Sequence, residues 1–156
     1  MLSIDGISHQ IISSLFTYKQ DKLGTENDCK VVLNHLIRKF SEPLSRDGNQ
    51  EVYFSKLIND DVKVIKEHLF PVNEVMKKLL KLELSSTKKE LAAYVKELLS
   101  TSLVIVNITK EEDDMLNLCG YQQSMPTEYH EQNHELFDDK WARYKMAGIF
   151  SNIEIK

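Results

Sequence analysis

The sequence has few of the residues that break, cross-link or loosen a chain. Its 156 residues include only five glycines and three prolines, which leaves little room for long flexible linkers. The two cysteines, Cys29 and Cys119, lie far apart and form no Cys-x-x-Cys pair. Neither a structural zinc cluster nor a disulfide framework is therefore supported, and we expect two reduced, partly buried thiols.

Long hydrophobic runs are also missing. A run such as Leu103–Val106 is far shorter than the roughly 20 apolar residues of a membrane-spanning helix. The first residues, Met1 to Gly6, have neither the basic start nor the apolar stretch of a signal peptide. These absences predict a cytoplasmic protein that does not bind a membrane.

The sequence does contain many apolar residues at helical spacing. It is 42% hydrophobic and 28% charged, close to the averages of globular domains. Stripes that repeat at i, i+3, i+4 and i+7 predict helices over residues 4–16, 29–40, 72–80 and 91–99. Thr87 with Glu90, and Thr109 with Glu112, have the spacing of a capping box. Gly120 should end the helix that Thr109 begins.

Other segments carry a weaker pattern. Residues 41–50 supply turn-forming side chains, so the helix over 29–40 should stop at Pro43 and a loop should follow. Residues 52–58 mix alternating and helical spacing, and we assign them to a helix, as we do a short segment from Asp61. A last helix is expected to run from about Pro126 to Ala147.

Together these segments predict a mostly α fold. We expect a single domain over residues 1–156, built as a compact helical bundle of six to eight helices. Only two segments, 103–108 and 149–155, have the β-branched character of strands. They allow a minor two-stranded β element in which the two pair with each other. No internal repeat, low-complexity tract or shift in composition divides the chain.

Charge is distributed unevenly along the sequence. Residues 111–139 contain no lysine or arginine and nine acidic residues: Glu111, Glu112, Asp113, Asp114, Glu128, Glu131, Glu135, Asp138 and Asp139. Because the formal net charge of the whole chain is −4, the remaining residues carry +5. The acidic segment repels phosphates and attracts basic surfaces. We therefore expect no nucleic-acid partner.

The acidic segment predicts contact with a basic protein partner. Charged side chains would speed the association, and aromatic side chains would supply the contacts that usually dominate interface energy. The predicted contact residues are four acidic and two aromatic ones: Glu111, Glu112, Asp113, Asp114, Tyr121 and Tyr129. A solvated acidic face that only aids solubility is the simpler alternative.

One short motif points to different chemistry. Residues 130–134 read His-Glu-Gln-Asn-His and match the zinc-protease pattern H-E-x-x-H. On one helical face, His130 and His134 would hold the metal and Glu131 would activate the bound water. A third ligand is required: Glu154, twenty residues beyond His134 but near the C-terminus, or instead Asp138, one turn beyond His134. The two middle residues are polar, whereas zinc-protease helices resemble buried apolar segments there.

Paired carboxylates offer a second metal hypothesis. Glu111-x-x-Asp114 and Glu135-x-x-Asp138 could each lie on one helical face and together hold Mg²⁺ and a pyrophosphate. The pairs are similar to those of all-helical nucleotide pyrophosphohydrolases in spacing only.

The sequence favours a non-enzymatic, acidic helical binding or inhibitor-type protein that engages a basic protein partner through residues 111–139. This interpretation requires no cofactor. The alternative is a metal-dependent hydrolase that uses zinc at His130, Glu131 and His134, or magnesium at the paired acidic helices. The oligomeric state is open.

Overall fold

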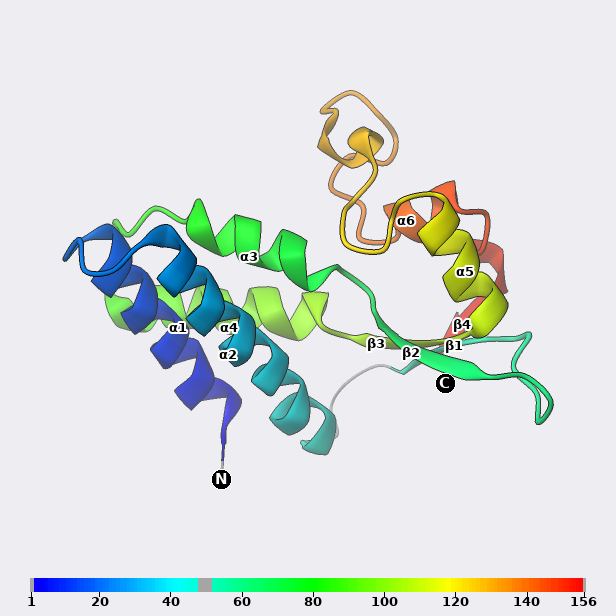
Figure 1. The fold of residues 1–156 in the computed structure, drawn as a ribbon, viewed down its shortest axis with the longest axis horizontal. Helices are drawn as coiled ribbons and strands as arrows, with labels where there is room; N and C mark the ends of the chain where they lie inside the picture. Colours follow the sequence, from blue (N-terminus) through cyan, green and yellow to red (C-terminus); the bar gives the residue numbers. More distant parts are fainter. Residues whose placement is uncertain (1, 48–51, 156) are drawn as a thin grey trace. The chain divides into compact units, whose positions relative to one another are not determined.

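The computed structural model describes residues 2–47 and 52–155, with all their side chains except those of Ser45 and Arg46. The described residues form six α-helices, two short 3₁₀ helices and four strands (Figure 1). The chain packs as two compact units. The helical unit comprises Met1–Gln50 and Val75–Thr101, and the sheet unit comprises Glu51–Glu74 and Ser102–Lys156.

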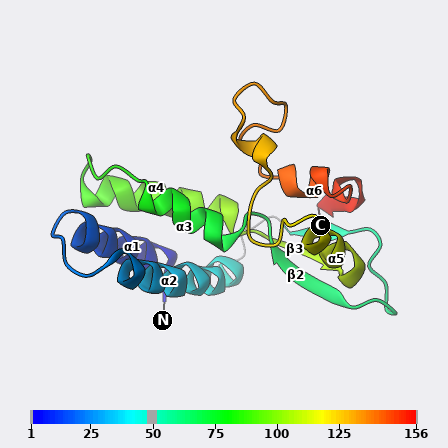
Figure 2. The ribbon, with the colours of Figure 1, turned by 45° about the horizontal axis from the view of Figure 1, so that its top comes forward.

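The helical unit is built from amphipathic helices. It contains α1 (Ile4–Lys19), α2 (Glu26–Arg46), most of α3 (Val72–Leu80) and nearly all of α4 (Lys88–Ser102). Figure 2 shows α1 and α2 lying side by side. Each helix buries one apolar stripe, and the most deeply buried side chains are Ile7, Ile11, Ile12, Leu15, Leu33, Ile37, Phe40, Val75, Leu79, Val95 and Leu99. The helices predicted over 4–16, 29–40, 72–80 and 91–99 are thus confirmed.

Local hydrogen bonds set the helix ends in this unit. Thr25 and Asp28 form a full capping box at the start of α2, with the Asp28 amide donating to Thr25 Oγ1 over 3.1 Å. Thr87 Oγ1 likewise accepts from the amide of Glu90 at the start of α4. At its other end, α2 continues through Pro43 to Arg46. The predicted stop at Pro43 is therefore wrong.

Pro43 is tolerated because it lies close to the end of α2. A proline in the last turn removes a single helical hydrogen bond, and Pro43 is itself buried, so apolar packing offsets that loss. The predicted loop over 41–50 is helical as far as Arg46, and its residues 48–50 lie outside the described residues.

The sheet unit contains a four-stranded mixed sheet. Its strands are β1 (Tyr53–Ser55), β2 (Val64–His68), β3 (Ile105–Thr109) and β4 (Ile153–Ile155), in the order β2-β3-β1-β4. The neighbours β1 and β3 are parallel, and the other two pairs are antiparallel. In the register, Tyr53 lies opposite Val106 in β3 and Ile155 in β4.

Two helices cover the sheet. They are α5 (Lys110–Leu118) and α6 (Ala142–Met146), and two 3₁₀ helices, η1 (Thr127–His130) and η2 (Phe150–Asn152), flank α6 along the chain. Leu116 of α5 and Tyr144 of α6 share one core cluster with Val106 and Ile108 of β3. Both helices therefore lie against the same face of β3.

The predicted fold class is wrong: the chain is not a helical bundle with a minor β element but combines helices with a four-stranded mixed sheet. Residues 52–58 and the segment from Asp61 contain strands β1 and β2 instead of helices. Strands of three and five residues are too short to reveal their period, and the spacing of Val62, Ile65 and Leu69 imitates a helical stripe. Residues 103–108 and 149–155 do contain strands, but β1 lies between them.

The long helix predicted from Pro126 to Ala147 does not form. Only η1 and the five-residue α6 are helical there, with turns between them. Side chains bond to the backbone in those turns: His134 Nδ1 accepts from the amide of Leu136, and Asp139 Oδ1 accepts from that of Trp141. Such bonds satisfy backbone donors locally and so compete with a helix.

The prediction of a single domain stays a prediction, because the two units describe packing and not the cooperativity of folding. Within residues 2–47 and 52–155, no helix combines the length and apolar character needed to cross a membrane.

Candidate functional site

The predicted acidic contact residues lie on α5, and one of them is a structural cap. Thr109 and Glu112 form a full capping box: Thr109 Oγ1 accepts from the amide of Glu112, and Glu112 Oε1 accepts from the amide of Thr109 over 3.0 Å. Glu112 Oε2 also accepts from Asn152 Nδ2 in η2, and only 2% of Glu112 is exposed. Glu112 is therefore buried as the cap of α5 and leaves almost no surface for a partner to contact.

The other three acidic residues of α5 differ in their surroundings. Asp114 is exposed and pairs with Lys110 one turn earlier, and this hydrogen bond raises the pKa of Lys110. Asp113 is half-buried, with a carboxylate oxygen 3.9 Å from Lys110 Nζ. Glu111 is exposed and has no ion pair with any residue that the structure describes. Glu111 is thus the α5 carboxylate that is free to meet an external cation.

The outward face of α5 combines acidic and apolar side chains. Glu111, Asp114, Met115 and Leu118 follow one another at i, i+3, i+4 and i+7, so they form one row on the helix, called here the α5 stripe. Leu118 is 87% exposed and Met115 is 39% exposed. The opposite face of α5 places Leu116 in the core. The α5 stripe therefore presents an apolar surface that nothing in its own unit covers.

The two predicted aromatic residues are placed differently. Tyr121, just beyond α5, is half-buried against the core cluster, and this burial raises the pKa of its phenol. Tyr129 is only 5% exposed, packs on Phe70 with ring centroids 5.6 Å apart, and donates from its hydroxyl to Asp138 Oδ1. Burial also raises the pKa of Tyr129. Tyr121 remains partly accessible, whereas Tyr129 is a core residue.

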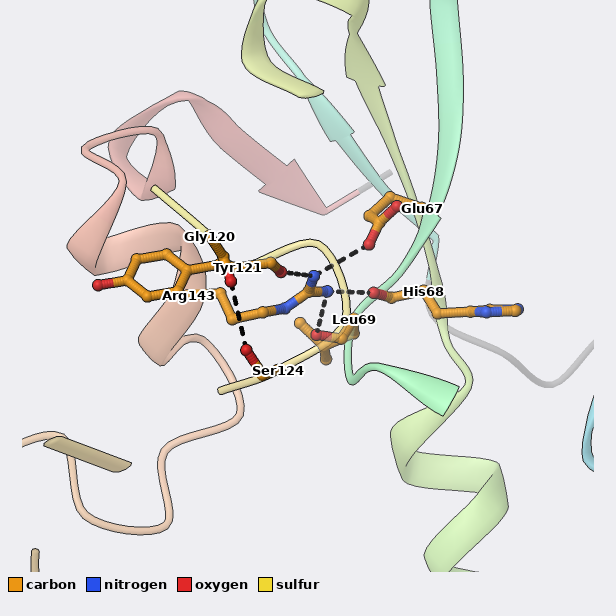
Figure 3. A network of polar contacts seen from close by, with 7 residues as sticks. All are labelled: Glu67, His68, Leu69, Gly120, Tyr121, Ser124 and Arg143. Carbon is orange, nitrogen blue, oxygen red and sulfur yellow. Dashed lines mark hydrogen bonds and ion pairs between the residues drawn. The ribbon is translucent and has the colours of Figure 1, made fainter. Parts of the chain in front are cut away.

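The end of α5 is held by a buried arginine that the sequence did not suggest. Arg143 of α6 has no exposed surface, and its guanidinium lies among carbonyl groups (Figure 3). Nη1 donates to the carbonyl of Tyr121 over 2.8 Å and to Glu67 Oε1 over 3.0 Å, and Nη2 donates to the carbonyls of His68 and Leu69. The guanidinium thereby ties the segment after α5 to the end of β2.

Two further features accompany this network. Burial raises the pKa of Glu67, and the nearby Arg143 charge only partly offsets that effect. Ser124 donates to the carbonyl of Gly120, which closes the turn beyond α5 (Figure 3). Nothing in the local sequence marks Arg143 as buried, because its partners lie 22 to 76 residues away along the chain.

The residues of the zinc-protease pattern do not come together as that pattern requires. His130 ends η1 and is exposed, Glu131 is exposed, and His134 lies in a turn where its Nδ1 accepts a backbone hydrogen bond. The two histidines therefore do not share a helical face. Asp138 bonds to Tyr129. In the described part of the chain, no three His, Cys, Asp or Glu side chains are grouped closely enough to hold a metal ion.

The paired-carboxylate arrangement is not formed either. Glu111 and Asp114 do lie on a helix, but Glu135 and Asp138 lie in the turns between η1 and α6. A backbone φ of 54° at Asp138 breaks the helical path there. The pair of acidic helices that this hypothesis needs is therefore missing.

Comparisons with protein-family models, with curated proteins and with solved structures found no match to this chain. A function has to be inferred from the chain's own residues.

Proposed function

We propose that this protein is a non-enzymatic binding protein of the cytoplasm that engages a basic protein partner through the exposed residues of 111–139. One observation carries the proposal: Leu118, 87% exposed, lies on the same helical face as the unpaired carboxylate of Glu111. Exposed apolar area is unfavourable in water, by roughly 25 cal/mol per Å². A partner that covers Leu118 removes this cost, and Glu111 selects for partners that carry positive charge.

The turns after η1 also combine an exposed apolar side chain with carboxylates that have no ion pair in the described part of the chain. Phe137 is 45% exposed, and the exposed carboxylates of Glu131 and Glu135 stand close to it in the sequence. Neither of these two carboxylates has an ion pair among the residues described. Large apolar side chains beside uncompensated charge of one sign are typical of surfaces that bind a protein of the opposite sign.

Electrostatic attraction should act mainly on the rate of association. Charges at a surface steer an oppositely charged partner, and salt screens them over a Debye length of about 8 Å at physiological ionic strength. Dissociation should depend on the desolvated apolar contacts. The two contributions can therefore be separated by changing charge and apolar area in different variants.

The test is reversal of the three α5 carboxylates that do not belong to the capping box. A variant with Glu111→Lys, Asp113→Lys and Asp114→Lys keeps Glu112, because that residue caps α5. The matched control changes three exposed acidic residues of the helical unit, Asp21→Lys, Glu83→Lys and Glu97→Lys, and so has the same net charge. Each protein is used for affinity capture from its native cell, and the captured proteins are identified and quantified at low and at physiological salt.

We expect the wild type and the control to capture the same basic protein and the α5 variant to lose it. The difference between the variants should shrink as salt is added. Recovery of the same partner by the α5 variant, or of no partner by the wild type, would contradict the proposal.

A further inference from the structure

The α5 stripe has a fixed spacing between its charge and its apolar end. Glu111 and Leu118 are seven residues apart, which in an α-helix is roughly 10 Å at 1.5 Å per residue. Asp114 is already paired with Lys110, so Glu111 is the open carboxylate at one end. Met115 and Leu118 form the exposed apolar end. A partner helix that lies along the α5 stripe meets both ends when its cation and its apolar side chain are about 10 Å apart on one face.

This spacing discriminates between partner conformations. In an extended strand of about 3.3 Å per residue, roughly 10 Å corresponds to three residues, and side chains three apart point to opposite faces. In a helix the same distance corresponds to seven residues, and side chains seven apart share a face. A partner helix can also lie alongside α5 at the usual interaxial distance of about 8–10 Å.

We propose that the α5 stripe docks a basic amphipathic helix whose Lys or Arg lies two turns from a Leu, Met or Phe. This inference rests on the proposed function and names the kind of partner that the same surface takes. The partner's cation meets the Glu111 carboxylate, and its apolar side chain covers Leu118 and Met115. Methionine suits such a contact, because its flexible thioether adapts to the partner's shape.

The segment beyond α5 makes this surface rigid before the partner arrives. Gly120, at a φ of 78°, turns the chain after α5, and Tyr121 donates its amide to the carbonyl of Leu116 over 2.9 Å. The carbonyl of Tyr121 is in turn held by Arg143. Because the end of α5 is fixed on both sides, little conformational entropy is lost when a helix docks there.

The probes are two synthetic helical peptides of the same composition. In the matched peptide, two lysines lie seven residues from two leucines on one face; in the offset peptide, the lysines are shifted by two residues, which turns them to the far side of the helix. Dissociation constants are measured by fluorescence anisotropy with the full chain. The chain is used as wild type, as Leu118→Ser, as Met115→Ser and as the α5 charge variant.

Leu23→Ser is the matched control, because Leu23 is also exposed, at 62%, but lies in the loop between α1 and α2. We expect the matched peptide to bind the wild type about tenfold more tightly than the offset peptide. Leu118→Ser should weaken its binding by about tenfold, the scale of losing one interface hot spot. Met115→Ser should weaken it less, and Leu23→Ser should leave it unchanged.

The outcomes separate the two proposals. If the charge variant loses both peptides equally while Leu118→Ser has no effect, the acidic surface binds basic partners but helix docking on the α5 stripe is rejected. Equal binding of the two peptides to the wild type rejects helix docking as well. If charge reversal changes the affinity for neither peptide, the proposed function itself fails.

Discussion

The helical unit and the sheet unit are stabilised in different ways. Among the described residues, the helical unit buries apolar stripes and one polar residue, Ser8, whereas the sheet unit buries six polar or charged ones: Ser55, Glu74, Ser102, Thr109, Glu112 and Arg143. Long helices satisfy their own backbone, so apolar packing is enough to hold them together. Short strands and helices leave more backbone ends, and buried side chains must satisfy these.

The two units also differ in charge. The sheet unit has 15 Asp and Glu against 8 Lys and Arg, a net charge of −7, and the helical unit has 9 against 12, a net charge of +3. These values add up to the −4 of the whole chain. The acidic character is therefore a property of the unit that also exposes Leu118 and Phe137. This coincidence supports the proposal that the sheet unit binds the partner.

The largest effect is expected from removing the buried cation of the sheet unit. Arg143→Leu would leave Glu67 and three carbonyl oxygens without their donor, and breaking a buried pair from one side costs about 3–5 kcal/mol. The control, Arg38→Leu, changes an exposed arginine of α2 and should cost less than about 0.5 kcal/mol. Urea unfolding of both variants measures the difference. If Arg143→Leu and Arg38→Leu lower the free energy of unfolding by similar amounts, the Arg143 network does not stabilise the sheet unit.

The next effect concerns the apolar core of the helical unit. Leu33→Ala removes a fully buried side chain of α2 and should lower the free energy of unfolding by about 3 kcal/mol through lost burial and the cavity left behind. Its neighbour Val32 is 44% exposed, so Val32→Ala should cost less than about 0.5 kcal/mol. Chemical denaturation measures the free energy of unfolding of both variants. A small loss in Leu33→Ala would mean that the stripe of α2 is not packed as described.

A smaller effect should separate two adjacent glutamates. Glu112→Ala removes the capping box and the bond to Asn152, which should cost about 1–2 kcal/mol. Glu111→Ala removes an exposed side chain and should change stability by less than about 0.5 kcal/mol. The thermal midpoints of the two variants give the comparison. A larger loss of stability in Glu111→Ala than in Glu112→Ala would contradict this assignment. Glu112 would then remain a predicted contact residue, and Glu111 would not.

The smallest effect is a pH dependence at Glu67. Burial raises its pKa in the folded protein, so the folded state holds the Glu67 proton more tightly than the unfolded state does. The resulting stability is present below the unfolded pKa of about 4.3 and is lost as pH rises through the higher folded pKa. The wild type should therefore lose stability relative to Glu67→Gln as the pH rises above the unfolded pKa of about 4.3. A relative gain would show that the attraction of Arg143 outweighs burial.

The sequence predicted parts of the molecule where the evidence is local. The helices α1 to α4 were recognised because each shows apolar residues at the 3.6-residue period. The Thr109–Glu112 capping box and the turn at Gly120 were also correct, since cap and partner lie within one turn. The strands β1 and β2 were missed because three to five residues do not establish a period.

For the candidate site, the sequence showed which residues are charged but not which are accessible. The absence of lysine and arginine from 111–139 is visible in the letters. The sequence does not show that Glu112 and Tyr129 are buried or that Leu118 is exposed. It also does not show where Arg143 lies. Each depends on a contact with an element that lies elsewhere in the chain.

The sequence by itself determined the helices over 4–16, 29–40, 72–80 and 91–99, the Thr109–Glu112 cap and the charge of each stretch, because these follow from residues within a turn or two of one another. Only the tertiary structure decided that β1 pairs with β3, some 50 residues away, and with β4, about 100 residues away. It also decided which face of α5 turns outward. A side chain of a helix is buried when an element from elsewhere in the chain packs against it. The packing that forms minimises the exposed apolar area of the whole unit and not of any one segment.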